Sequence, residues 1–238
     1  MPIVSPRALA AIPALIVFIT VGIVLVFVLP IAVAIAIAIV FGLAVGWIVV
    51  RTAPSQLLKS LGAKPLEDDT EPRLEGLVES ICASHGITEP RLYVIEVSAI
   101  DALVVGHADD TRLVVTTGML AELDRLELEA VVARELSLFG QGIQAATVLA
   151  TIGPYLGPLG PRLRNRLLDG RRLASADIDG VKLTRYPPAL ASAFEKVKDA
   201  ARVTDRPASR HLWMVGPAGV NQPIQPSLIE RIDTLREL

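Results

Sequence analysis

The stretch ALAAIPALIVFITVGIVLVFVLPIAVAIAIAIVFGLAVGWIVV, residues 8–50, decides the architecture of the chain. It holds 43 residues without a charged side chain, and Thr20 is its one clearly polar residue. A membrane-spanning helix needs about 20 apolar residues, so this run is about twice as long as one span. Pro30 interrupts a helical hydrogen-bond ladder and favours a reversal near Leu29 and Pro30. We therefore predict a transmembrane helical hairpin over residues 1–51, with one long tilted helix as the alternative.

Basic residues flank the apolar run on both sides. Arg7 precedes it, and Arg51, Lys59 and Lys64 follow it, whereas the predicted turn has no charge. Because the cytoplasmic loops of membrane proteins carry an excess of Lys and Arg, both ends of the hairpin are expected in the cytoplasm. The prediction is a multi-pass protein of the inner (cytoplasmic) membrane, with residues 52–238 forming a cytoplasmic domain.

Charge and cysteine content exclude two classes of protein. A formal net charge of −2 gives no sign of a nucleic-acid partner. The single cysteine, Cys82, excludes an internal disulfide framework and agrees with a reducing compartment. Cys82 lies in the stretch GLVESICASHG, where we expect it to be a small core residue.

Small residues recur every four positions in the second half of the apolar run. This helix-packing face consists of Ala34, Ala38, Gly42 and Gly46. Small side chains at this spacing let another helix approach closely. The partner is either residues 8–29 or a helix of another integral membrane protein.

The remaining chain mixes helical and strand patterns. A linker is expected over 52–71, because it contains prolines and a run of acidic residues, and a helix is expected from Pro72. Residues 91–97 and 112–117 have the pattern of strands, with 106–110 as the turn between them. Residues 122–139 alternate apolar and charged side chains at helical spacing. The fold class is therefore α+β and mostly helical, with a small antiparallel sheet.

Residues 143–161 are uncharged but contain repeated Gly-Pro pairs. Such a segment is a poor transmembrane helix, so we expect either a membrane-surface loop or a packed irregular stretch. An arginine-rich stretch follows, which either binds anionic lipid headgroups or forms a solvated helix face. The candidate lipid-binding residues are Arg162, Arg164, Arg166, Arg171 and Arg172. Two further helices are expected near 187–202 and 227–237.

Several motifs in one order resemble a known family. They are DALVVG (101–106), VVTTGML (114–120), LELEAVVAREL (126–136), RRLASADIDGVKLTRYPPALASAFEKV (171–197) and HLWMV (211–215). Preceded by an apolar hairpin, this order resembles the HtpX-like membrane zinc metallopeptidases, which are relatives of the CAAX prenyl proteases. The resemblance implies a zincin-like domain whose H-E-x-x-H helix provides two histidine ligands, with a glutamate as the third. The motif glutamate would then act on a zinc-bound water.

The chain departs from this motif at each ligand position. Arg134 and Leu138 stand at the two histidine positions, and Leu173 stands at the third-ligand position aligned from Asp177. A guanidinium stays protonated and has no free lone pair, and leucine has no donor atom. Glu135 remains, but a base without an activated water has little to do. We therefore expect no metal, no other cofactor and no catalytic residue.

The sequence shows no other set of residues that would replace the missing zinc ligands. Asp101 replaces the asparagine of the strand motif. The three histidines, His85, His107 and His211, do not pair at helical spacing, so each is expected to be a capping or surface residue.

Arg134 needs a different role. We expect its guanidinium to replace the metal cation and to pair with Asp177, and with Glu135 as a second candidate partner, since a buried charge needs a partner. The alternative is that Arg134 reaches solvent along its helix. The predicted function is an inactive homologue that acts as an accessory or scaffold subunit of a membrane complex, such as a transporter or a quality-control assembly. One alternative is a zinc peptidase with non-standard or partner-supplied ligands. Another is a membrane-surface protein that binds anionic lipid. In addition, strand 112–117 is expected at a sheet edge, where it could accept an extended peptide as a further strand.

Overall fold

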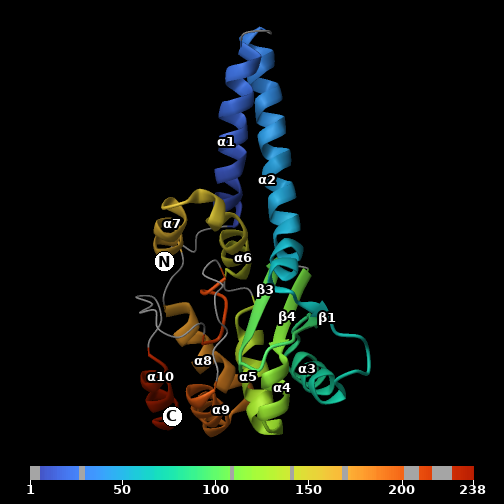
Figure 1. Ribbon diagram of the computed structural model, residues 1–238, viewed down its shortest axis with the longest axis vertical. Helices are drawn as coiled ribbons and strands as arrows, with labels where there is room; N and C mark the ends of the chain where they lie inside the picture. Colours follow the sequence, from blue (N-terminus) through green and yellow to red (C-terminus); the bar gives the residue numbers. More distant parts are fainter. Residues whose placement is uncertain are drawn as a thin grey trace.

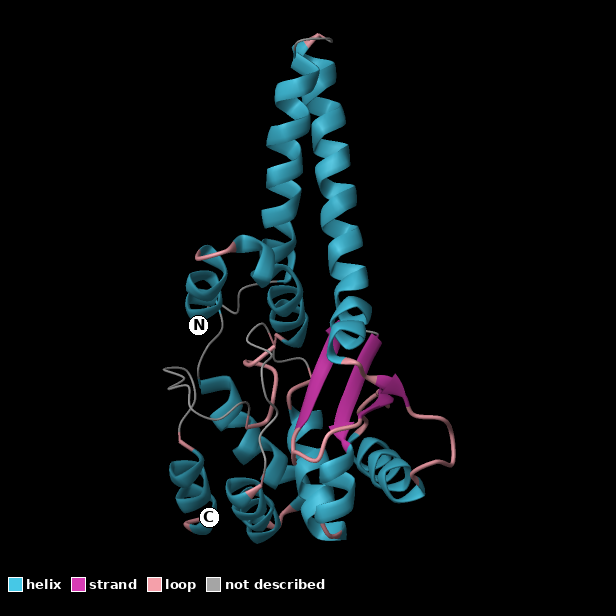
Figure 2. Cartoon of the chain, in the orientation of Figure 1, coloured by secondary structure: helices cyan, strands magenta, loops and turns pink. Residues whose placement is uncertain are grey.

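The computed structural model describes residues 6–26, 30–107, 110–139, 142–167, 171–200, 209–215 and 227–238. Two long helices form a hairpin that stands out from a domain of helices and one sheet (Figure 1). The sheet lies at the base of the hairpin, and most domain helices lie beyond it (Figure 2).

The hairpin consists of α1 (Pro6–Val26) and α2 (Ile31–Leu61). The small-residue face of α2, Ala34, Ala38, Gly42 and Gly46, is buried in the hairpin. A Cβ on Gly42 would lie only 2.7 Å from the carbonyl oxygen of Ala14, so the backbones of α1 and α2 approach closely there. The packing partner of this face is therefore α1, the first of the two predicted alternatives. Among the described residues, α2 is the one helix that is both long and apolar enough to cross a membrane.

Helix α2 continues into the domain. The linker predicted over 52–71 is wrong in its first part, because α2 ends only at Leu61, where Gly62 adopts a left-handed φ of 68°. Leu57, Leu58 and Leu61 pack under the sheet, which explains why Pro54 does not end the helix there. The hairpin is thus joined to the domain by a continuous helix.

The sheet contains β1 (Lys64–Pro65), β2 (Arg91–Ile95), β3 (Ala102–His107) and β4 (Asp110–Thr116), in the order β1-β2-β4-β3. The predicted antiparallel sheet is wrong in one respect, because β2 and β4 pair in parallel. The turn predicted over 106–110 lies partly outside the described residues. The strands on either side of it are β3 and β4, which pair antiparallel, so it does not directly follow 91–97.

The second strand prediction to be corrected is the position of β4. It lies between β2 and β3, so it is not an edge strand and has no free edge for a peptide. The edge strands of the described sheet are β1 and β3, and Trp213 forms an isolated bridge with Leu103 of β3. The segment that contains HLWMV therefore covers part of the β3 edge.

The remaining helical elements lie beside and beyond the sheet (Figure 1). They are α3 (Pro72–His85), α4 (Thr117–Glu122), α5 (Arg125–Ser137), α6 (Ile143–Ile152), the 3-10 turn η1 (Gly153–Leu156), α7 (Leu159–Leu167), α8 (Arg171–Thr184), α9 (Pro187–Asp199) and α10 (Leu228–Arg236). The irregular segment expected over 143–161 is wrong at its start, because α6 is a buried helix that contacts both α2 and β3. Cys82 is 1% exposed in the main core, as expected.

Candidate functional site

Helix α5 carries the motif residues into the interior. Asp124 and Glu127 form a capping box at its start, which fixes where the first turn begins. The apolar side chains of α5 pack against α3, α8 and α9. Arg134 and Glu135, one turn before the helix ends, are both 0% exposed. Two adjacent charged residues are therefore held in a fully buried place.

Arg134 pairs with the residue predicted for it. Its Nε donates to Oδ1 of Asp177 on α8 at 3.1 Å, and its Nη1 donates to Oε1 of Glu135. The prediction of an Arg134–Asp177 ion pair is confirmed, and the alternative of a solvent-exposed Arg134 is wrong. Gly180 makes this approach possible, since a Cβ there would lie 2.5 Å from the Cα of Arg134.

A second arginine, Arg231 on α10, completes the arrangement. It binds Asp177 with two hydrogen bonds, Nε to Oδ2 at 2.6 Å and Nη2 to Oδ1 at 2.7 Å. Its Nη1 donates to the carbonyl of Met214 at 2.9 Å, and its guanidinium carbon lies 4.3 Å from the ring centre of Phe194. This bidentate geometry is the one in which arginine binds carboxylates most strongly.

Sequence reasoning missed Arg231, although a signal was present. Leu228, Ile232 and Leu235 follow the helical spacing of an apolar face, and Arg231 falls on that same face. A charged residue on the buried face of an amphipathic helix indicates a buried partner.

Arg134, Glu135, Asp177 and Arg231 form what we call the buried charge quartet. Two guanidinium groups meet two carboxylates, so the formal charges cancel. Burial alone would lower the pKa of the Arg134 guanidinium, but the charges of Glu135 and Asp177 and their hydrogen bonds outweigh it and raise that pKa. Arg134 therefore remains protonated at all relevant pH values.

The surroundings of Glu135 determine whether a metal ion could fit beside it. The family resemblance implies two histidine ligands on α5. Arg134 stands at the first of these positions, and Leu138, which is 1% exposed within the apolar core, stands at the second. Neither group donates a lone pair, and the guanidinium repels a dication. The Leu173 side chain lies outside the described residues. The described side chains at this place therefore do not fit a zinc ion.

His85 and His211 contact backbone carbonyls on other elements than those of the quartet. His85 is the last residue of α3 and contacts the carbonyl of Ile81 at 3.0 Å. The surface or capping position expected for His211 is wrong, because His211 is buried and its Nε2 lies 2.9 Å from the carbonyl oxygen of Ala146. The side chain of His107 lies outside the described residues. Within the described part of the chain, no three His, Cys, Asp or Glu side chains are grouped as metal ligands would be.

Asp101 connects two distant segments. Its Oδ1 accepts the backbone N–H of Ala102 at 2.9 Å and that of Val215 at 3.2 Å. The strand motif and the HLWMV segment are thus joined at the start of β3.

The predicted lipid-binding arginines are only partly described. Arg162 and Arg166 are exposed on α7, and Arg164 is partly buried. Arg171 and Arg172 begin α8, but their side chains lie outside the described residues.

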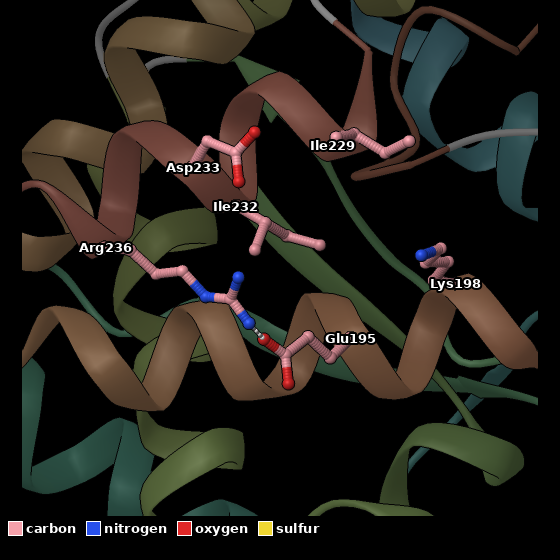
Figure 3. A pocket seen from close by; sticks show the side chains of 6 residues that line it. All are labelled: Glu195, Lys198, Ile229, Ile232, Asp233 and Arg236. Carbon is pink, nitrogen blue, oxygen red and sulfur yellow. Dashed lines mark hydrogen bonds and ion pairs between the residues drawn. The ribbon is translucent and has the colours of Figure 1, made fainter.

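A surface pocket of about 290 Å³ lies between α9 and α10 (Figure 3). Its lining residues are Glu195, Lys198, Ile229, Ile232, Asp233 and Arg236. Arg236 points to Glu195 and pairs with it across the pocket (Figure 3). A second pocket, of about 460 Å³, lies between α3 and the β1–β2 edge and is lined by several carboxylates. Neither of these pockets is lined by a member of the quartet.

Comparisons with known proteins agree with the motif order. Residues 68–141 match peptidase family M48. A protease HtpX homolog of Tropheryma whipplei (strain Twist) is 28% identical over 82% of this chain and 83% of its own length. The protease HtpX homolog of Dictyoglomus thermophilum is 26% identical over 82% of this chain and 78% of its own length.

Among solved structures, Ste24p of S. mikatae aligns with 94% of this chain and 61% of its own chain, at 15% identity and a TM-score of 0.48. The sequence matches thus show that residues 68–141 are similar to peptidase family M48 and that most of the chain is similar to protease HtpX homologs.

Proposed function

We propose that this chain has lost zinc-dependent hydrolysis and acts as a membrane-held accessory or scaffold subunit of a larger membrane protein complex. The observation that carries the proposal is the Arg134 guanidinium at the first ligand position, 0% exposed and bonded to Glu135 and Asp177. A metal ion could enter only after this cation had left both carboxylates.

The state of Glu135 supports the same proposal. A general base must reach a water or a substrate to accept its proton. Glu135 is 0% exposed and pairs with a permanently charged neighbour. Its carboxylate serves here to balance a buried charge.

The membrane part of the proposal is that both α1 and α2 span the inner membrane and that the domain lies in the cytoplasm. The mean hydropathy of α2 and the basic residues that follow the hairpin support it. Because the small-residue face packs against α1, a partner subunit would contact the outward side of the hairpin. Phe41 and Leu43, which are 57% and 67% exposed, lie there.

The first test measures zinc and proteolysis on the full chain purified in mild detergent. We expect much less than one zinc per chain and no cleavage of an unfolded substrate protein above the level of Glu135→Ala. A matched gain-of-function control is Arg134→His with Leu138→His and Leu173→Glu, which restores three donor groups. Stoichiometric zinc in the natural chain, with proteolysis abolished by Glu135→Ala, would establish the alternative of a peptidase with unusual or partner-supplied ligands.

The second test addresses the scaffold role. Native mass spectrometry after gentle extraction from the source membrane should show this chain in a stoichiometric complex with another integral membrane protein. Phe41→Ala with Leu43→Ala should dissociate that complex, whereas Leu126→Ala, at an apolar site on the domain that is 54% exposed, should not. A chain that is monomeric under all mild extraction conditions contradicts the scaffold role.

A further inference from the structure

Apolar side chains are exposed where the domain meets the hairpin. We define the elbow as residues 153–166, which form η1 and most of α7. Tyr155 is 88% exposed and Leu159 is 55% exposed. Figure 1 places α7 beside the lower end of α1, at the junction of hairpin and domain. Large apolar groups at such a junction indicate contact with another phase or molecule.

The elbow lies level with the point where α2 would leave a bilayer. Residues 31–50 form a helix about 30 Å long, which matches the hydrocarbon thickness of a membrane. Trp47 is 65% exposed, and the Arg51 guanidinium lies 5.7 Å from its ring centre, as expected at a membrane–water boundary.

Two contacts fix the height of the elbow relative to this boundary. The hydroxyl of Thr151, two residues before the elbow, donates to the carbonyl of Ala53 at 3.2 Å. Leu163 of α7 and Val49 and Val50 of α2 pack against one apolar cluster. The elbow therefore lies within about one helical turn of the Trp47–Arg51 level.

The sequence segments that form the hairpin and the elbow carry charge of one sign. Residues 1–66 and 136–168, which we call the basic end, contain seven of the 23 Lys and Arg residues and none of the 25 Asp and Glu residues. Arg162 and Arg166 are exposed and follow Leu159 at a spacing that places all three on one side of α7. Such a surface is complementary to anionic lipid headgroups.

The shape of the elbow is fixed by its glycines. Gly157 has a φ of 51°, and a Cβ on Gly160 would lie 2.4 Å from the carbonyl oxygen of Gly153. The turn is thus tightly closed, and Tyr155 and Leu159 are exposed on its surface.

We propose that the elbow docks on the cytoplasmic membrane surface, with Tyr155 and Leu159 inserted at headgroup level and Arg162 and Arg166 paired with phosphates of anionic lipids. The proposal rests on the membrane anchoring that forms part of the proposed function. It is independent of whether the quartet excludes zinc. Docking would fix the tilt of the domain beneath its hairpin.

The test uses the full chain in nanodiscs of phosphatidylcholine, alone or mixed with phosphatidylglycerol. Tyr155→Cys is labelled with an environment-sensitive fluorophore, and quenching by lipids with a headgroup nitroxide is measured. Ile229→Cys is the matched control, because Ile229 is apolar, 57% exposed and lies on α10 at the far end of the domain. The natural chain is the labelling blank, since Cys82 is 1% exposed.

We expect the probe at residue 155 to be quenched several times more strongly than the probe at residue 229. Equal quenching of the two probes overturns the proposal. A probe at residue 155 that is shielded from water but not quenched by lipid also overturns it, because a protein surface would then cover the elbow.

Trp47 separates failure of the elbow from failure of anchoring. Trp213, the second of two tryptophans, is 1% exposed in the domain, so lipid quenching of tryptophan emission reports Trp47. Quenching of Trp47 without quenching at residue 155 overturns docking and leaves anchoring intact. Absence of both overturns docking together with the membrane part of the proposed function.

A separate variant tests the pairing of Arg162 and Arg166 with lipid phosphates. Arg162→Gln with Arg166→Gln should weaken the phosphatidylglycerol-dependent part of the quenching by about fivefold for each charge removed. Added salt should have the same effect on the natural chain and little on the variant. A phosphatidylglycerol dependence that survives both substitutions overturns the assignment of these arginines to lipid phosphates.

Discussion

The buried charge quartet and the basic end treat arginine in opposite ways. In the quartet, Arg134 and Arg231 are 0% and 5% exposed, and carboxylates of the same chain neutralise them. At the basic end, Arg162 and Arg166 are exposed in a stretch of sequence without any acidic residue. The difference separates arginines whose charge is neutralised within the chain from arginines whose charge is available to an external anion.

This difference has a thermodynamic consequence. Charges buried in low dielectric interact strongly and are little screened by salt, whereas exposed charges are screened within a Debye length of about 8 Å at physiological ionic strength. The quartet should therefore govern the stability of the fold, and the basic end should govern association.

The largest expected effect follows from removal of the shared carboxylate. Asp177→Ala leaves two buried guanidinium groups with one remaining carboxylate, and loss of one partner of a buried pair costs about 3–5 kcal/mol. We expect a fall of this size in the free energy of unfolding, measured by denaturant titration in detergent. Asp179→Ala is the control, because Asp179 lies on the same helix and pairs with Lys182, whose side chain is 70% exposed. The control should lose less than about 1 kcal/mol, and equal losses would contradict a special role for the quartet.

A second, smaller effect is expected at the contact of α5 with α8. In Gly180→Ala the new Cβ would lie 2.5 Å from the Cα of Arg134, so the helices must separate. Overpacking of this kind costs about 1–3 kcal/mol. Gly76→Ala on α3 meets nothing within 4 Å and should instead stabilise the chain by about 0.5–1 kcal/mol. If both variants change stability in the same direction, the close approach at Arg134 is not a constraint.

Glu127 offers a case between the two regions, since its side chain is 4% exposed and that of its partner Lys196 is 41% exposed. Burial would raise the pKa of Glu127, but hydrogen bonds from Lys196 and Ser192 outweigh it and lower that pKa. A lowered folded-state pKa contributes stability above the unfolded pKa of about 4.3 and loses it as the pH falls through the folded value. Glu127→Gln should therefore lose about 1 kcal/mol at neutral pH, after allowance for solvent screening.

The pH dependence provides the check on this interpretation. The difference in unfolding free energy between the natural chain and Glu127→Gln should be constant from neutral pH to about pH 5 and should shrink below about pH 4. A difference that grows on acidification would show that the folded-state pKa of Glu127 is raised.

The parts predictable from sequence are those with local signals. The hairpin follows from run length and from small residues at a four-residue spacing, and both are local properties. The Arg134–Asp177 pair was predictable only through the family resemblance, because the two residues are 43 positions apart. Arg231 is 54 positions from Asp177, and no local sequence pattern indicates that Asp177 is the partner of Arg231.

The errors have physical reasons as well. The strand patterns of 91–97 and 112–117, with one turn between them, suggested an antiparallel hairpin. Residues 102–107 instead form a further strand, β3, and β4 lies between β2 and β3 in the sheet. Parallel pairing of β2 with β4 depends on a crossover that composition does not reveal. The helix-breaking Gly-Pro pairs of 143–161 begin only at Gly153, so the preceding ten residues were free to form α6.

The smallest expected effect lies at the basic end. Arg162→Gln removes an exposed charge from a segment without acidic residues, so no internal carboxylate in that segment loses a partner. We expect the unfolding free energy in detergent to change by less than about 0.5 kcal/mol, as is usual for surface positions. The same denaturant titration used for Asp177→Ala measures it, at low and at high salt. A loss above about 1 kcal/mol would mean that the fold neutralises Arg162 internally, and the two regions would then no longer differ in how they balance charge.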